Sequence, residues 1–213
     1  MSEATAESSA APESNLEKPK GTGGRVLDWW RSHCDPATAD PGTRARLRRC
    51  DSPIDAATIP AAVTLARRLG AFADGVDDRR VATALNLARV LAQVREHAPG
   101  APMRAAGWKS FAGDRKESEA GEDRPLLSEA RFRRLLTTGP GEEQVVAFVR
   151  LVAILDGAVD VAALGADFLD WEHPWRGERV RKRWAEDYFA ARTAGATSDP
   201  SPTTDSIPAE ADA

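Results

Sequence analysis

Arginine is the residue type in this sequence whose spacing most clearly points to a chemical role. The first group holds four arginines within six residues: Arg44, Arg46, Arg48 and Arg49. At about 100° per residue, Leu47 and Cys50 fall on one side of a helix. Three of the arginines fall within an arc on the opposite side, and Arg46 sits at its border. Because no acid lies among them, this face can bind phosphate. Alternatively, it is a solvated face whose arginines pair with acids from elsewhere, such as Asp51, Asp55 or Asp77.

A second group of arginines lies in a segment that the sequence predicts to be helical. Its members are Arg131, Arg133 and Arg134. Ser128 precedes them, and serine is a favoured N-cap because its oxygen accepts an unpaired amide of the first turn. Phe132, Leu135 and Leu136 then fall on one face at i, i+3 and i+4. Either the arginines form a solvated face over a core helix, or the helix presents them to phosphates.

This helix is the first half of a predicted hairpin over residues 125–155. Residues 138–141 break it, because Pro140 cannot continue a helix and glycine permits left-handed geometry. Glu142 and Glu143 suit the positive end of a second helix, which carries a broad apolar stripe down to Leu155. A hairpin this apolar is not stable alone, so the flanking helices must pack on it.

The last predicted helix, over residues 175–192, carries a third basic concentration beside aromatic residues. The basic residues are Arg176, Arg179, Arg181, Lys182 and Arg183. Trp184, Tyr188 and Phe189 form its expected inner face. Basic residues interleaved with tryptophan can stack on bases. The same pattern also arises when the tryptophans are core residues and the arginines are solvated, and that is the commoner case.

Two helices are expected to position these groups. The first is the helix that carries the first arginine group, and Thr43 is expected to cap it. The longest helix is expected to run from Asp77 or Asp78 to about His97, and its apolar residues cover so much of its circumference that it should be central. Arg89 is expected among its exposed positions.

The composition predicts an all-α fold, a compact multi-helix bundle of two packed helical halves. Alanine, arginine and leucine dominate, aromatics make up 6%, and alternating apolar and polar runs are scarce. No window has the unbroken apolar length of a transmembrane helix. The start of the chain lacks the basic and apolar segments of a signal peptide. A cytoplasmic location without membrane contact is therefore expected.

The charge distribution divides the chain into three parts. Residues 1–24 and 193–213 are acidic segments of disordered composition, and they flank a helical domain over residues 25–192. The net charge is -4, but the two segments hold eight acids and two bases, so the domain has two more bases than acids. Within it, residues 103–112 are expected to form a short helix with Trp108 and Phe111, and residues 113–124 an exposed loop.

Other chemistry is not indicated. The sequence has no glycine-rich phosphate loop and no H-E-x-x-H pair. A zinc site or small metal-dependent enzyme would need His33, Cys34 and Cys50 to converge, at a spacing that structural zinc modules do not use. The acids lie at caps and on exposed faces, without the pairing of acid–base catalysis. We therefore expect neither a catalytic activity nor a cofactor.

Several segments resemble one family in order and spacing. The run LSEARFRRLL over residues 127–136 resembles the central motif of the CasB family, the small subunit of type I-E CRISPR Cascade complexes. Residues 44–49 resemble its early Arg-Leu-Arg-Arg helix, and residues 82–97 its long central helix. Residues 168–171, followed by Arg183-Trp184 and Tyr188-Phe189, resemble its C-terminal end.

This resemblance implies a non-catalytic, all-α subunit present in two copies per Cascade complex. It implies contacts with the backbone subunits, the large subunit and the second copy. A basic surface of the family helps to hold the guide RNA–target DNA duplex and the displaced strand of the R-loop. The alternative is a helical protein–protein interaction module with no nucleic-acid role, whose arginine faces pair with acidic partner surfaces.

Overall fold

The computed structural model describes residues 21–107 and 125–196, with side chains described up to 190. Its helices are α1 Thr22–His33, α2 Pro41–Arg48, α3 Pro53–Ala57, α4 Pro60–Arg68, α5 Asp78–Leu91, α6 Pro102–Ala106, α7 Glu129–Leu136, α8 Glu142–Ile154, α9 Val161–Asp170 and α10 Pro174–Ala196. Two short strands, β1 Glu96–His97 and β2 Ala158–Val159, pair in parallel. The all-α prediction is confirmed.

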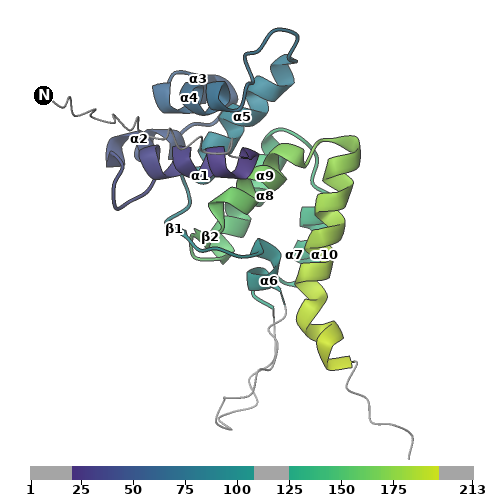
Figure 1. Cartoon of the computed structure of the whole chain (residues 1–213). Coiled ribbons are helices and arrows are strands. Elements are labelled where there is room, and N and C mark those ends of the chain that lie inside the picture. The colour runs from purple at the N-terminus through teal and green to yellow at the C-terminus, as the bar shows by residue number, and fades with distance from the viewer. Residues whose placement is uncertain (1–20, 108–124, 197–213) are drawn as a thin grey trace, which may run out of the picture.

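The helices pack around one hydrophobic core that runs through both parts of the chain. Helix α1 lies across α9, and α6 packs on α10, so helices from before and after residues 108–124 cover one another (Figure 1). Helices α3 and α4 lie on α5 at one end, and α10 runs along one side. The two halves expected from the sequence therefore share a single core.

Helices α1 and α10 extend slightly beyond the predicted ends of the helical domain. Helix α1 begins at Thr22 and α10 runs to Ala196, so helical structure extends beyond 25 and 192 at both ends. The predicted disorder of the two acidic segments falls largely outside the described residues. Trp108, Phe111 and the loop expected over 113–124 also lie outside them.

Helix α5 is central, as predicted, and every residue from Ala84 to Ala92 is buried. It is shorter than expected, because it ends at Leu91 and the chain then turns into β1, which pairs with β2. The longest described helix is α10. His97 lies in β1 rather than at a helix end, and its Nδ1 accepts a hydrogen bond from the Val161 amide at the start of α9.

Local sequence explains where the arginine-bearing helices begin. Asp40, not Thr43, caps α2: its carboxylate accepts from the amides of Gly42 and Thr43, and Pro41 occupies the first turn. Ser128 holds the N-cap position of α7, but its side chain accepts no capping hydrogen bond. The hairpin turn occurs where predicted, with Gly141 at a φ of 75°.

An aromatic cluster fixes α7 and α8 against the C-terminal helices. Phe148 of α8 packs edge-to-face on Phe168 and Trp171. Phe132 of α7 stacks on Tyr188 of α10, with ring centroids 4.0 Å apart. The Tyr188 hydroxyl donates to the Leu127 carbonyl at 2.6 Å, just before α7 begins. The predicted hairpin is therefore held by flanking helices, as its apolar character requires.

We expect Tyr188→Phe to lower the free energy of unfolding by about 1 kcal/mol, because the Leu127 carbonyl loses its buried donor while the ring remains. Tyr188→Ala should cost about 3–5 kcal/mol, because it also leaves a cavity beside Phe132. Urea denaturation of the two variants measures both values. A Tyr188→Ala cost below that of Tyr188→Phe would contradict the described packing.

Candidate nucleic-acid interface

The four arginines of α2 have different environments, although they share one short helix. Leu47 is fully buried and anchors α2 against α5. Arg44 is half-buried, and it donates from Nε to the Ala92 carbonyl at 2.9 Å and from Nη2 to the Val94 carbonyl at 3.1 Å. These carbonyls follow the end of α5, where helical amide partners run out. Arg44 therefore fixes α2 to α5, and much of its donor capacity is used within the fold.

Burial and the nearby charge of Arg48 lower the pKa of Arg44. Arg48 is exposed, and its Nε donates to Gln93 Oε1 at 3.0 Å. Arg46 and Arg49 are exposed and form no ion pair with any residue in the described ranges. Arg46 is thus more open than its predicted border position suggested. Within the same ranges, no ion pair links these arginines to Asp51, Asp55 or Asp77, the acids considered as their partners.

The arginines of α7 also divide into paired and unpaired side chains. Arg133 forms an exposed i, i+4 ion pair with Glu129 at 3.5 Å. Arg131 and Arg134 are exposed, have no ion-pair partner among the described residues, and line a groove of about 930 Å³ between α7 and α8. Exposed i, i+4 pairs contribute little stability, so Arg133 is also available to an external phosphate.

The groove combines an apolar floor with a basic rim. Leu135, Leu151 and Ile154 contribute to its apolar surface, and Val146 is exposed within it. Arg150 of α8 adds a third arginine to the lining. Arg150 was not among the arginines predicted to bind phosphate, although it is the one basic residue of its helix. Only the packing of α8 on α7 brings it into the same groove as the other arginines.

Arg89 was predicted to be exposed, and this was wrong: the residue is 6% exposed. Its Nε donates to the Cys50 carbonyl at 2.9 Å, just beyond α2. Its Nη1 and Nη2 donate to the two carboxylate oxygens of Glu142 at 2.7 and 3.1 Å, and Nη1 also donates to Asn86. Because Glu142 lines the groove, one guanidinium links the end of α2 to the groove that carries the second arginine group.

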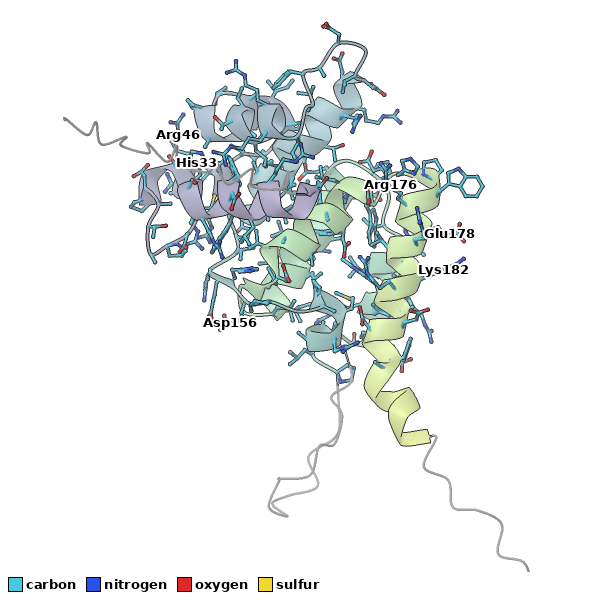
Figure 2. All side chains as sticks on the ribbon, in the orientation of Figure 1. His33, Arg46, Asp156, Arg176, Glu178 and Lys182 are labelled. Carbon is cyan, nitrogen blue, oxygen red and sulfur yellow. The ribbon has the colours of Figure 1, made fainter. Side chains whose placement is uncertain are left out.

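The third basic concentration, on α10, is mostly paired. Arg176 bonds to Asp170 at 2.7 Å, and Lys182 bonds to Glu178 at 2.8 Å. Glu178 and Lys182 project from the outer side of α10, whereas Arg176 lies on the side toward the end of α9, where it bonds to Asp170 (Figure 2). Arg183 bonds to the buried carboxylate of Asp167.

Arg181 is also part of the fold, because its guanidinium lies 4.4 Å from the Trp171 ring and its Nε donates to the Leu136 carbonyl. Trp184 is buried with its Nε1 on Asp167 at 2.6 Å. Trp184 and most of the basic residues of this helix therefore fit the interpretation in which the tryptophan is a core residue, rather than the one in which it stacks on bases. Arg179 differs, since it is exposed and has no partner in the described part of the chain.

His33, Cys34 and Cys50 were considered as metal ligands, but no metal site was predicted. In the described ranges, no group of three or more histidine, cysteine, aspartate or glutamate side chains could hold a metal ion. Burial raises the pKa of the Cys34 thiol to about 12, so it is protonated at neutral pH. His33 packs beside Trp29, and burial lowers its pKa. None of the helices in these ranges has the length and hydropathy to span a bilayer.

The match to a family model is consistent with this arrangement of helices. Residues 43–189 match the model of CRISPR-associated protein Cse2. The chain therefore belongs to the Cse2 family, also called CasB, whose members are the small subunits of type I-E CRISPR Cascade complexes. The matched range contains both exposed arginine groups. No curated protein and no solved structure matches the chain.

The bridge from Arg89 to Glu142 predicts unequal roles for two neighbouring acids. We expect Glu142→Ala to lower the free energy of unfolding by about 1–3 kcal/mol, because it leaves a buried guanidinium without its counter-ion. Glu143→Ala is the matched control. It removes the same charge from the same first turn, but Glu143 forms no ion pair with a buried cation among the described residues. Equal urea midpoints for the two variants would contradict the bridging role of Glu142.

Proposed function

We propose that this Cascade subunit acts without catalysis or a cofactor, as a source of sequence-independent contacts to nucleic acid. Its ligands are the guide RNA–target DNA duplex and the displaced strand. The observation that carries the proposal is a set of exposed arginines with no ion-pair partner in the described ranges: Arg46, Arg49, Arg131 and Arg134. Such groups remain in water unless an external anion binds them.

The other predicted arginines contribute to different degrees. Arg48 and Arg133 keep exposed guanidinium groups, which within the described residues bond to Gln93 and Glu129 respectively. Arg44 orients α2 through two backbone carbonyls and acts mainly as a positioning residue. Arg150 joins the set because it lines the same groove as Arg131 and Arg134.

The small free-energy difference between the two duplexes that exchange in R-loop formation explains why such contacts matter. The guide–target duplex is about as stable as the DNA duplex that it replaces, so small protein contributions decide how far the R-loop opens. Each phosphate contact releases counter-ions and makes binding fall with salt. Guide pairing supplies the sequence specificity, and the arginines add affinity for any sequence. This role suits a complex that acts in the cytoplasm, where no membrane contact is needed.

We expect Arg46→Glu/Arg49→Glu to weaken target binding by the assembled complex about tenfold or more, since each exposed contact is worth up to about 1 kcal/mol and reversal adds repulsion. The slope of log affinity against log salt concentration should decrease in magnitude by up to about 2, because up to two phosphate contacts are lost. Electrophoretic mobility shifts at several salt concentrations measure both quantities.

Arg79→Glu/Arg80→Glu is the matched control for that experiment. It makes the same charge change at exposed positions in the first turn of α5. Residue 80 lies about 18 Å along the helix axis from residue 92, which contacts Arg44. Equal losses in the two variants would mean that total charge, rather than the α2 face, determines binding.

The groove supports a second role at the same surface, namely contact with another Cascade subunit. Its floor is apolar, with Val146 exposed, and solvated apolar grooves favour protein segments over phosphates. The backbone subunits, the large subunit and the second copy are the candidate partners. In this arrangement Arg131 and Arg134 face acidic residues of the partner, as in the interaction-module alternative.

A polar substitution on the groove floor separates these two roles. We expect Val146→Asn to reduce incorporation into the complex at least severalfold while leaving the binding of the isolated chain to single-stranded DNA within twofold, because the change adds no charge beside Arg131 and Arg134. Ile54→Asn is the control, because Ile54 is exposed on α3, outside the groove lining. Co-purification yield measures incorporation. Full incorporation of Val146→Asn would contradict the protein-docking role.

A further inference from the structure

Trp175 differs from the other tryptophans whose side chains the structure describes. It is 75% exposed, whereas Trp29, Trp30, Trp171 and Trp184 are at most 2% exposed. An indole has a large apolar face and usually contributes its area to a core or an interface. The fold therefore leaves a large aromatic surface in water at the start of α10, among charged residues.

No contact within the described residues requires an indole at position 175. Trp175 lies in the first turn of α10, after Pro174, and its backbone amide donates to His173 Nδ1 at 3.2 Å. That bond involves only the main chain of Trp175 and is available to other residue types at this position. Nine residues separate Trp175 from Trp184, which rotates it by about 180° from the buried face. The side chain is thus directed away from the core that Trp184 and Tyr188 build.

The surroundings of Trp175 are basic. Arg179 follows one helical turn later on the same face, is exposed, and has no ion-pair partner within the described residues. Arg176 and Lys182 are also exposed, and their ion pairs with Asp170 and Glu178 are accessible to solvent. Such pairs contribute little and exchange readily for a phosphate. The indole is therefore followed along the same face of α10 by the guanidinium of Arg179 and the ammonium group of Lys182.

We propose that Trp175 stacks on an unpaired nucleobase while Arg179 contacts the adjoining phosphate. The ligand class is single-stranded nucleic acid, because the base faces of a duplex are already stacked. Aromatic platforms beside cationic side chains are the usual means of binding a single strand without sequence preference. This site rests on the proposed function and deepens it. The arginines can contact the phosphates of a duplex or of a single strand, whereas Trp175 can stack only on an unpaired base.

A protein ligand fits this surface less well. Anchor residues of protein interfaces are surrounded by a ring of further contacts that excludes water. The exposed residues beside Trp175 are instead charged or small: Pro174, Arg176, Glu178 and Arg179. Trp175 also lies outside the apolar groove between α7 and α8.

The test compares two oligonucleotides with the same phosphates. The full chain is titrated with a thymidine 20-mer and with an abasic 20-mer that lacks the bases. We expect Trp175→Ala to weaken binding of the thymidine oligomer about 5- to 150-fold, the range measured for loss of one stacked base. Binding of the abasic oligomer should stay within twofold. Trp175→Phe should recover most of the loss, and Ile54→Ala, another exposed apolar residue, should change neither.

Three results would overturn the proposal, and they have different consequences. If Trp175→Ala leaves salt-dependent thymidine binding unchanged, stacking is wrong and the proposed function stands. If the unsubstituted chain binds neither oligomer, the proposed function fails together with the stacking site. If Trp175→Ala binds both oligomers normally but no longer joins the assembled complex, the indole anchors a protein partner.

Discussion

The buried guanidinium of Arg89 is the constraint on which the arrangement of the basic surface depends. It bonds to the chain after α2, to Asn86 on its own helix and to both carboxylate oxygens of Glu142 at the start of α8. A buried cation is costly unless it is paired and fully hydrogen-bonded. These three segments must therefore meet in one geometry, and that geometry joins the end of α2 to the groove between α7 and α8.

The aromatic cluster supplies the second constraint. Phe148, Phe168, Trp171 and Trp184 hold α8 and α9 against α10, while Tyr188 fixes the start of α7 through its hydroxyl. Because α7 and α8 are locked from behind, their exposed arginines project from rigid helices rather than from loops. Rigid presentation limits the entropy lost when phosphates bind, which suits a subunit whose contribution to target binding comes from many weak contacts.

Much of this fold follows from the sequence, because helical periodicity reports burial directly. The all-α class, the central position of α5 and the hairpin break at Gly141 all come from local patterns. The failures involve side chains whose partners lie far away in the sequence. Arg89 looked exposed because Glu142 is 53 residues distant, and Arg44 looked free because the carbonyls it meets belong to the end of another helix. The exposure of Trp175 could have been predicted from the sequence, since helical periodicity places Trp175 on the side of α10 opposite to Trp184.

The central claim is that this subunit adds phosphate contacts that stabilise the open target duplex. The most direct test is reconstitution of the guide-loaded complex with and without the chain, followed by measurement of its affinity for matched double-stranded target at two salt concentrations. The account predicts that the chain joins the complex and raises target affinity, and that the gain shrinks as salt increases. A chain that joins the complex without changing target affinity at either salt concentration would contradict it.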